Sequence, residues 1–303
     1  MILFNTHIYN QVINTQYKSI TIEIKREDLI HPYISGNKYR KLKFNIRKAL
    51  EIKSKTLLTF GGAYSNHIAA VASAGKAFGF ETIGVIRGDE LKLKKNLNPT
   101  LQFAKANGMR FKFVSREDYR NKTNIDFVSK LRNEFDDFYL IPEGGTNSLA
   151  IQGCEEILHK DDEAFDYICC AVGTGGTISG IINASKKHQQ VLGFPALKND
   201  LLQLDIRKFA NQENWKLITD YHFGGYGKIK PELIAFINRF KKTNGIPLDP
   251  IYTGKMMYGI FDLIEKGFFL NGSKVLAIHT GGLQGIDGMN ELLKRKNLPL
   301  IDI

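Results

Sequence analysis

Two lysines stand at the start of a helical pattern, in a setting that makes an amine reactive. Residues 35–41 read Ser-Gly-Asn-Lys-Tyr-Arg-Lys, and the helical spacing of Leu42 and Ile46 begins just after them. Lys38 and Lys41 are three residues apart, so they lie one turn apart on the same helix face. A helix N-terminus and a second cation both disfavour an ammonium, which lowers its pKa and favours imine formation by Lys38. Apart from this setting, Lys38 reads as an ordinary surface lysine.

A glycine-rich loop is the best candidate for binding an anion. It consists of Gly173, Thr174, Gly175, Gly176 and Thr177. The loop follows an apolar run and opens a helical pattern, so successive backbone N–H groups and two threonine hydroxyls can point at a phosphate. Its spacing fits neither a dinucleotide fingerprint, because position 178 is isoleucine, nor a P-loop. Two interpretations stay open: a site for a smaller phosphate cofactor, or a bare strand-to-helix turn.

Glycine pairs follow three further apolar runs that are typical of strands. They are Gly61-Gly62, Gly144-Gly145 and Gly281-Gly282. Each pair stands where a backbone must turn sharply or approach a ligand closely. One such loop is ordinary turn chemistry, but four loops after four strand ends favour a single large ligand site.

Strand-like and helix-like segments alternate along the chain. The predicted strands cover residues 56–60, 82–86, 110–114, 138–141, 167–172, 191–195, 216–220 and 275–278. The predicted helices cover residues 66–78, 99–106, 125–134, 149–159, 178–187, 201–210, 231–241, 258–265 and 286–294. This alternation predicts an α/β fold whose parallel sheets are covered by helices. In such sheets ligands bind beyond the carboxyl ends of the strands, where the glycine loops lie.

The composition narrows the choice of partners. The chain has 303 residues and a net charge of +11, but its lysines are scattered among separate elements, so we expect a solvated basic surface and no nucleic-acid partner. No apolar run approaches the roughly 18 residues that span a bilayer, so we expect no membrane partner. The first residues lack the basic and apolar regions of a signal peptide, which favours a cytoplasmic protein.

Three cysteines are too few, and odd in number, for a disulfide framework. They are Cys154, Cys169 and Cys170. Cys169 and Cys170 are neighbours in a predicted strand, so their side chains point to opposite faces and do not form a joint metal site. We expect small buried side chains here and no bound metal.

Five stretches resemble, in the same order, the motifs of one enzyme family. They are residues 35–42, 61–79, 173–177, 249–260 and 279–282, which read SGNKYRKL, GGAYSNHIAAVASAGKAFG, GTGGT, DPIYTGKMMYGI and HTGG. The chain resembles the 1-aminocyclopropane-1-carboxylate deaminase and D-cysteine desulfhydrase family in them. That family depends on pyridoxal 5'-phosphate and belongs to the tryptophan-synthase-β-like superfamily.

The resemblance implies the architecture and the cofactor. It implies an α/β, two-domain, tryptophan-synthase-β-like fold (PLP fold type II), in which a small domain interrupts a large one. The large domain would comprise residues 1–45 and 148–303, and the small domain residues 46–147. The resemblance also implies a homodimer that binds pyridoxal 5'-phosphate and a small amino-acid substrate.

The resemblance implies five contacts with the cofactor. Lys38 would be the Schiff-base lysine, and the 173–177 loop would hold the phosphate with Lys41 near it. Asn66 would hydrogen-bond the phenolic oxygen, Tyr252 would lie on or beside the ring, and Thr280 would face the pyridine nitrogen.

The same resemblance implies the substrate pocket. Ser65 would lie beside the substrate as a nucleophile or proton-handling group, and Tyr252 would join Lys38 and Ser65 as a catalytic residue. His67, Tyr226 and Thr253 would line the pocket. Taken without the family, Ser65 and Asn66 read as a cap for the next helix, and both roles can hold at once. Either Ser65 or Lys38 could take the Cα proton.

Two threonines indicate the branch of the family. The deaminase branch carries glutamate where this chain has Thr253, and leucine where it has Thr280. A carboxylate keeps the pyridine nitrogen protonated, whereas a hydroxyl holds that proton less firmly and makes the ring a weaker electron sink. The expected reaction is therefore α,β-elimination on D-cysteine or a related β-substituted amino acid, giving pyruvate, ammonia and sulfide. The alternatives are 1-aminocyclopropane-1-carboxylate deamination and a PLP-binding protein without turnover.

Overall fold

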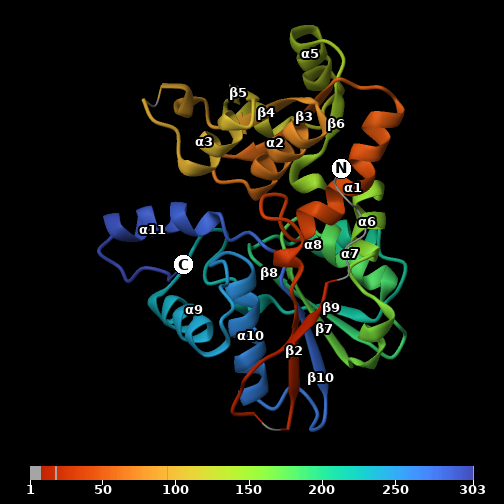
Figure 1. Ribbon diagram of the computed structural model, residues 1–303, viewed down its shortest axis with the longest axis vertical. Coiled ribbons are helices and arrows are strands. Elements are labelled where there is room, and N and C mark those ends of the chain that lie inside the picture. Colours follow the sequence, from red (N-terminus) through yellow and green to blue (C-terminus); the bar gives the residue numbers. More distant parts are fainter. Residues whose placement is uncertain (1–7, 18, 94, 303) are drawn as a thin grey trace.

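Two separate sheets organise the chain in the computed structural model, which describes residues 8–17, 19–93 and 95–302 (Figure 1). The larger sheet has the strand order β1-β2-β10-β7-β8-β9, and the smaller sheet has the order β5-β4-β3-β6. Apart from the antiparallel β1–β2 pair, the strand pairs are parallel, as predicted. The strands are β1 (Asn10–Val12), β2 (Thr21–Lys25), β3 (Thr56–Gly62), β4 (Glu81–Arg87), β5 (Met109–Val114), β6 (Tyr139–Ile141), β7 (Tyr167–Val172), β8 (Gln190–Pro195), β9 (Trp215–Leu217) and β10 (Lys274–Ile278).

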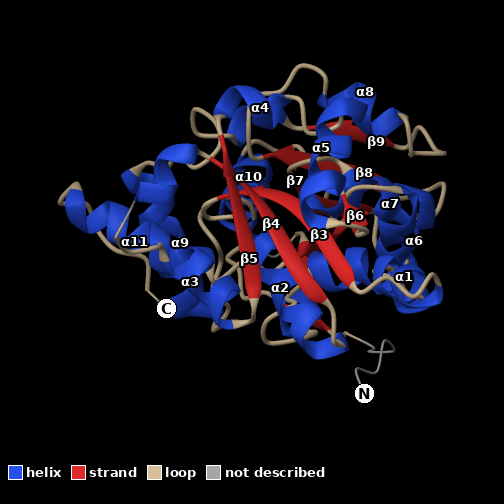
Figure 2. Cartoon of the chain, turned by 90° about the horizontal axis from the view of Figure 1, so that it is seen from above, coloured by secondary structure: helices blue, strands red, loops and turns tan. Residues whose placement is uncertain are grey.

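Helices surround both sheets (Figure 2). The α-helices are α1 (Asn37–Glu51), α2 (Asn66–Phe78), α3 (Pro99–Ala106), α4 (Arg116–Arg120), α5 (Ile125–Phe135), α6 (Ser148–Glu155), α7 (Gly176–Ala184), α8 (Leu202–Arg207), α9 (Pro231–Asn244), α10 (Thr253–Glu265) and α11 (Gly285–Arg295). Short 3-10 helices connect some of them: η1 (Glu27–Leu29), η2 (Asp89–Leu93), η3 (Glu143–Gly145), η4 (Lys160–Ala164) and η5 (Thr219–Tyr221).

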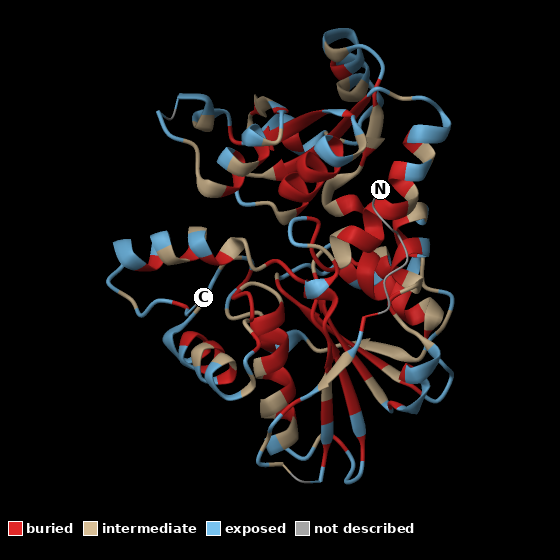
Figure 3. Ribbon diagram, viewed as in Figure 1, coloured by how far each residue is buried: buried red, intermediate tan, exposed pale blue. Residues whose placement is uncertain are grey.

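Strand β7 shows why both faces of the larger sheet are covered. Its apolar side chains alternate between two cores: Cys169 and Ala171 pack with α9 and α10, whereas Ile168, Cys170 and Val172 pack with α7 and α8. Figure 3 shows the buried residues along these strands and the helices around them. The two neighbouring cysteines therefore face opposite sides, as predicted, and the three cysteines of the chain are free and buried.

The smaller sheet is also covered on both faces, and α1 joins it to the larger one. Leu57 packs with α2 and with the α1 residues Leu42 and Ile46, whereas Leu58 packs with α4 and α5. Helix α1 also packs against α6, which packs against α7 of the larger sheet. The helix that carries Lys38 thus lies at the junction of the two parts (Figure 1).

Sheet membership divides the chain much as the predicted domains do. The strands of the smaller sheet lie between residues 56 and 141, and those of the larger sheet lie on either side. The predicted boundary between residues 45 and 46 falls inside α1, one continuous helix that contacts both parts. Positions 1–7, 18, 94 and 303 of the predicted ranges lie outside the described residues, and the division stays a prediction.

Several predicted elements have different ends in the structure. Helix α10 begins at Thr253 instead of 258, because the Asp249 carboxylate accepts the first N–H groups and turns the chain into the helix early. Helix α6 ends at Glu155 instead of 159, because the following chain turns into η4, where Asp162 pairs with Lys25 at 2.9 Å.

The segments around residues 201–220 are shorter than predicted. Helix α8 covers Leu202–Arg207, and strand β9 ends at Leu217. Strand β9 stops because its pairing with β8 ends at Gly193, after which the chain turns into η5 and Tyr221 hydrogen-bonds Asp262 on α10 at 2.5 Å.

Strands β1 and β2 and helix α4 lie in segments where no element was predicted. Charged residues such as Glu23 alternate with apolar ones in β2, and the strand is stabilised by its pairing with β10 on one side and β1 on the other. The pairing with β10 joins residues from opposite ends of the chain, so local spacing does not reveal it.

Candidate active site

Loops from both sheets meet at the carboxyl ends of their strands. The Asn37 side chain, at the start of α1, donates to Oγ1 of Thr177 on α7 at 2.7 Å. The hydroxyl of Thr146, after η3, lies 2.6 Å from that of Thr174, after β7. A methyl group added at Gly282 would lie 2.8 Å from Nδ2 of Asn66. The glycine loops therefore converge on one place, as their positions after the strands predict.

Lys38 lies in the first turn of α1, held there by a close backbone approach. A methyl group added at Gly36 would lie 2.0 Å from the carbonyl oxygen of Thr280, and that oxygen accepts the N–H of Asn37 at 3.3 Å. Nζ of Lys38 donates to Oδ1 of Asn37 at 3.1 Å. Removal from water and, second, the positive charge of Lys41 lower the pKa of Lys38 to about 7.

Lys41 is a buried cation one turn further along α1. Its Nζ donates to the carbonyl oxygen of Gly144 at 3.0 Å and to Oγ1 of Thr146 at 3.1 Å. Burial lowers its pKa. Among the described residues, neither Lys38 nor Lys41 forms an ion pair with a carboxylate. Two neighbouring ammonium groups without a counter-charge favour an anionic ligand.

The start of α7 provides a place for that anion. Gly175 precedes the helix and provides no side-chain cap, which leaves first-turn N–H groups available to a ligand. A methyl group added at Gly176 would lie 2.7 Å from Oγ1 of Thr146 and 3.1 Å from Nζ of Lys41. Backbone N–H groups, a hydroxyl and a cation thus face the same space, as a phosphate requires.

Ser65 and Asn66 begin helix α2 after the loop that follows β3. Oγ of Ser65 accepts the N–H of Ile68 at 3.4 Å, so the predicted capping role is confirmed. Oδ1 of Asn66 is buried and, within the described part of the chain, has no hydrogen-bond partner. An orphaned buried polar atom beside Gly282 marks a position that a polar ligand group would satisfy.

Tyr226 and Tyr252 form a pair on the side of the larger sheet. Their ring centroids lie 6.2 Å apart with the planes at 67°, and their hydroxyls share a hydrogen bond. Removal from water raises the pKa of both, and that of Tyr252 rises well above its ordinary value.

The two threonines that distinguish the branch have different surroundings. The fully buried hydroxyl of Thr253 donates to Oδ1 of Asp249 at 2.7 Å and accepts the Asp249 N–H at 3.0 Å. Thr280 lies against Gly36 at the start of α1. The contact of Thr253 with substrate stays a prediction, and in this structure its hydroxyl is directed to Asp249.

His67 is directed to strand β3. The Thr59 hydroxyl donates its one proton to the carbonyl oxygen of Ile141 at 2.8 Å, so Nε2 of His67, 2.8 Å from the same hydroxyl, carries a proton. Burial and the charges of Lys38 and Lys41 lower the pKa of His67 well below its ordinary value. The ring is therefore neutral, and its predicted contact with substrate remains a prediction.

Lys255 on α10 is a buried lysine whose amine is held more firmly than that of Lys38. Burial lowers the pKa of Lys255 to about 8, but its Nζ donates to the carbonyl oxygens of Ala196, His222 and Gly225. An ammonium has three donors, so these bonds use all of them. Lys38 has one such bond and the lower pKa, which makes it the better candidate for reacting with a carbonyl group.

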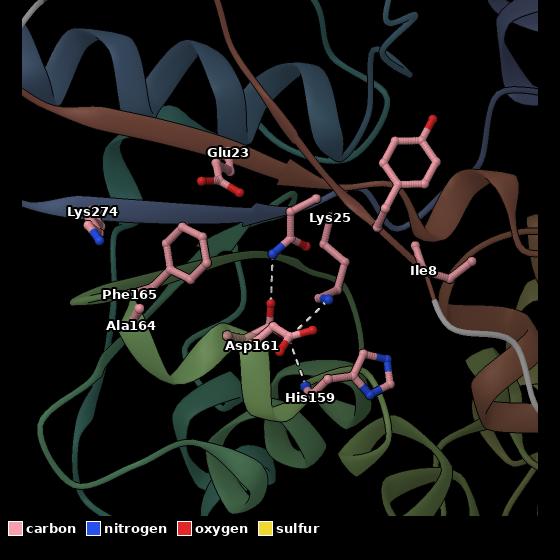
Figure 4. Close-up of a pocket in the computed structure, with 11 residues that line it drawn as sticks. Ile8, Glu23, Lys25, His159, Asp161, Ala164, Phe165 and Lys274 are labelled. Carbon is pink, nitrogen blue, oxygen red and sulfur yellow. Dashed lines mark hydrogen bonds and ion pairs between the residues drawn. The ribbon is translucent and has the colours of Figure 1, made fainter.

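A cavity of about 340 Å³ lies elsewhere, between β2 and η4 (Figure 4). At its centre Asp162 pairs with Lys25 and accepts hydrogen bonds from Asn10 and from the His159 N–H, at 2.8 Å and 2.7 Å. None of the predicted site residues lines it. The buried Lys25–Asp162 ion pair and its hydrogen bonds indicate a structural role.

Within residues 8–17, 19–93 and 95–302, no three His, Cys, Asp or Glu side chains are grouped so as to bind a metal ion. In the same ranges, no helix has the length and apolar character needed to cross a membrane.

Comparison with known proteins agrees with this site. Residues 13–281 match the model of a family described as "Pyridoxal-phosphate dependent enzyme". The chain belongs to this family. It is 32% identical, over 87% of its length and 85% of the relative's, to a putative 1-aminocyclopropane-1-carboxylate deaminase of Pyrococcus horikoshii. It is 33% identical, over 87% of its length and 72% of the relative's, to the mitochondrial bifunctional D-cysteine desulfhydrase/1-aminocyclopropane-1-carboxylate deaminase of Arabidopsis thaliana.

Solved structures show the same fold. A crystal structure of an ACC deaminase homologue superposes with a TM-score of 0.84 at 28% identity, covering 96% of this chain and 95% of the other. A hydrogen sulfide-producing enzyme of Fusobacterium nucleatum superposes with a TM-score of 0.68 at 15% identity, covering 91% and 96%. The second likeness concerns the fold alone. The expected two-part α/β architecture with parallel sheets is confirmed.

The residues present fit pyridoxal phosphate. The ammonium group of Lys41 and the α7 N-terminus suit its phosphate, and the amine of Lys38 suits its aldehyde. The unsatisfied Oδ1 of Asn66 suits a polar ring substituent. Residues from both sheets would therefore hold the cofactor.

Three residues with clear positions in the site were not predicted. Asn37 bridges Lys38 and Thr177, Thr146 joins Lys41 to the α7 loop, and Asp249 organises the start of α10. Asn37 and Asp249 stand inside stretches that resemble the family motifs, but their roles depend on contacts with distant loops. Thr146 directly follows Gly144-Gly145, and its place in that glycine loop is the sequence feature that could have identified it as a site residue.

Proposed function

We propose that this chain catalyses α,β-elimination on D-cysteine or a related β-substituted amino acid. In the overall reaction, cysteine and one water give pyruvate, ammonia and hydrogen sulfide. The Cα–H bond and the Cβ–S bond break, sulfur leaves with the bonding electrons, and water replaces nitrogen at Cα. The bifunctional relative from Arabidopsis thaliana supports a β-substituted substrate, because its name includes D-cysteine desulfhydrase.

One observation carries the proposal: the residue whose backbone meets the start of α1 is a threonine, Thr280, and its side chain is a hydroxyl and not a carboxylate. The family resemblance directs Thr280 to the ring nitrogen. The nearby Asp249 carboxylate already accepts four hydrogen bonds, from the N–H groups of Ile251, Tyr252 and Thr253 and from the Thr253 hydroxyl. A hydroxyl can donate to a neutral ring nitrogen, which leaves the ring a weaker electron sink. A weak sink suits a substrate with a good leaving group on Cβ.

The cofactor, when bound, withdraws electrons from the Cα atom of an amino acid attached to it. Nζ of Lys38 accepts the Cα proton, because a pKa of about 7 leaves much of the amine neutral near pH 7. Oγ of Ser65 is a far weaker base at that pH, so Ser65 orients the substrate. Oη of Tyr226, whose ring lies against that of Tyr252, donates a proton to the leaving sulfur, because its raised pKa keeps the hydroxyl protonated.

A product assay tests this proposal. Pyruvate, sulfide and 2-oxobutanoate are measured with D-cysteine, L-cysteine, D-serine, β-chloro-D-alanine and 1-aminocyclopropane-1-carboxylate. We expect pyruvate and sulfide from D-cysteine and pyruvate from β-chloro-D-alanine. Efficient 2-oxobutanoate formation without any sulfide would show that the branch assignment is wrong.

The second candidate is 1-aminocyclopropane-1-carboxylate deamination. Several relatives, including the one from Pyrococcus horikoshii, are named for this activity, which favours it. The same assay separates the two activities, because ring opening yields 2-oxobutanoate and no sulfide.

We also propose a cytoplasmic homodimer that takes a small amino acid and no nucleic acid. The resemblance supports the dimer, and three free, buried cysteines are compatible with a reducing compartment. Light scattering on a size-exclusion column should give twice the mass of the chain; a monomer would contradict the proposal.

A further inference from the structure

Lys255 is a buried cation outside the cofactor site. It lies in the first turn of α10, and its side chain is 1% exposed. Its Nζ donates to the carbonyl oxygens of His222 and Gly225 at 2.9 Å each and to that of Ala196 at 3.3 Å. No acceptor is on α10 itself. The ammonium therefore ties the start of this helix to two other segments of the larger sheet's part.

Two of the three acceptors belong to one loop, residues 222–228, which follows η5. Its backbone takes a positive φ at Phe223, 55°, and at three glycines, Gly224, Gly225 and Gly227. The intrinsic backbone preferences of these residues do little to stabilise this loop conformation. Phe223 is in a region that L side chains disfavour, and glycine is free to adopt many conformations. The conformation depends on outside contacts, and Lys255 supplies two of them.

The loop carries Tyr226 directly after Gly225. The Tyr226 hydroxyl meets that of Tyr252, which is the N-cap residue of α10 and stands three residues before Lys255. The start of α10 thus carries Tyr252 itself and contacts the loop of Tyr226 through Lys255.

We propose that Lys255 is a positioning residue that holds the 222–228 loop so that Tyr226 meets Tyr252. The proposal rests on the proposed function in giving this tyrosine pair a role in turnover. Lys255 touches neither substrate nor cofactor in this role, because its three donors are directed to backbone carbonyl oxygens. Its loss would leave those acceptors unsatisfied and release the loop.

A double-mutant cycle tests whether Lys255 acts through Tyr226. Lys255→Met keeps the length of the side chain and removes its donors, and Tyr226→Phe removes the hydroxyl that the loop is held to present. We expect Lys255→Met to lower kcat by about tenfold or more in the wild-type background and by less than about twofold in the Tyr226→Phe background. Equal losses in both backgrounds would overturn the proposal.

Two further measurements do not depend on turnover. Hydrogen exchange of the 222–228 amides should be slow in the wild-type holoenzyme and about tenfold or more faster in Lys255→Met, while the amides of β7 stay unchanged. The affinity for pyridoxal phosphate should change by less than about threefold, because the phosphate site is elsewhere. Fast loop exchange in the wild type, or no change in the variant, would contradict the proposal.

Lys255→Gln provides a second variant in case the methionine variant does not fold. An amide keeps two donors, so it should restore part of both the loop protection and kcat. If the elimination assay fails and only the cyclopropane substrate is turned over, the same cycle is run on that substrate. The reaction assignment and the positioning role therefore fail separately.

Discussion

Lys38 differs from Lys41 and Lys255 in how many oxygen atoms accept hydrogen bonds from its amine. Lys255 has three carbonyl acceptors and Lys41 has two oxygen acceptors, whereas the Lys38 amine has the Asn37 side chain. Its pKa is also depressed to about 7 by removal from water and by the charge of Lys41. An amine that is loosely held and partly neutral is suited to attack an aldehyde.

We predict that pyridoxal followed by borohydride labels Lys38 in the apoprotein. Labelling requires the neutral amine, so its rate should rise with pH through a midpoint near the pKa of about 7. Pyridoxal is used instead of its phosphate so that the phosphate site does not affect the rate. Peptide mapping identifies the lysine, and a label chiefly on Lys255 would contradict the assignment.

Lys41→Met provides the control for this midpoint. Removing the neighbouring positive charge stabilises the protonated form of Lys38, so its pKa should rise and the labelling midpoint should move to higher pH. Lys48→Met removes an exposed charge from the same helix and should leave the midpoint unchanged. An unmoved midpoint in Lys41→Met would show that the charge of Lys41 does not act on Lys38.

The connection between β7 and α7 shows how an element creates a binding site. The strand ends in the sheet, the loop turns, and the helix presents its first N–H groups where Lys41 and Thr146 arrive from other segments. A side chain at Gly176 would enter that space. The space is therefore a property of the helix start together with the residues that face it.

We predict that Gly176→Ala weakens cofactor binding more than it weakens the fold. The added methyl would lie 2.7 Å from Oγ1 of Thr146 and 3.1 Å from Nζ of Lys41, where the phosphate would bind. We expect the dissociation constant for pyridoxal phosphate to rise by about tenfold or more, measured by absorbance titration. Gly175→Ala is a poorer probe, because Gly175 has a φ of 84° and a side chain there strains the backbone.

Gly180→Ala is the matched control on the same helix. Its methyl would lie 2.5 Å from Cβ of Cys154, in the contact between α7 and α6 and away from the loop. This change should lower the free energy of unfolding by about 1–3 kcal/mol, as overpacking does, with little change in cofactor affinity. If both variants lost affinity equally, the loop would not be the phosphate site.

At the scale of the whole molecule, α1 joins the parts built on the two sheets. Arg40 of α1 forms two hydrogen bonds with the carboxylate of Glu27, at 2.9 Å and 2.7 Å, and both residues are buried. Glu27 lies in η1, just after β2 of the larger sheet, whereas the apolar face of α1 packs on the smaller sheet's core. The ion pair therefore anchors the helix that carries Lys38.

We predict that Glu27→Ala destabilises the protein by about 3–5 kcal/mol, because removal of one partner of a buried ion pair leaves a buried charge poorly compensated. Denaturant unfolding of the apoprotein measures the change. Glu51→Ala breaks the exposed Lys48–Glu51 pair on the same helix and should cost no more than about 1 kcal/mol. Similar effects of the two changes would contradict an anchoring role for Glu27.

Local spacing in the sequence located the candidate residues of the site, and the resemblance of five stretches to one family indicated their chemistry. Lys38 and Lys41 share a helix face because they are three residues apart, and the 173–177 loop is predicted to bind an anion because glycine follows a strand and opens a helix. The alternation of strands and helices likewise predicts parallel sheets with ligands at the carboxyl ends of the strands. These features depend on backbone geometry within a few residues, so the sequence determined them by itself.

Only the tertiary structure decided which side chains face one another. Asn37 meets Thr177 across 140 positions, Tyr226 meets Tyr252 through a loop tied by Lys255, and Thr253 is directed to Asp249. These contacts follow from the strand order, which places β10 between β2 and β7 and so brings loops from both ends of the chain together. Strand order results from long-range pairing and packing, and spacing within a segment carries no information about it.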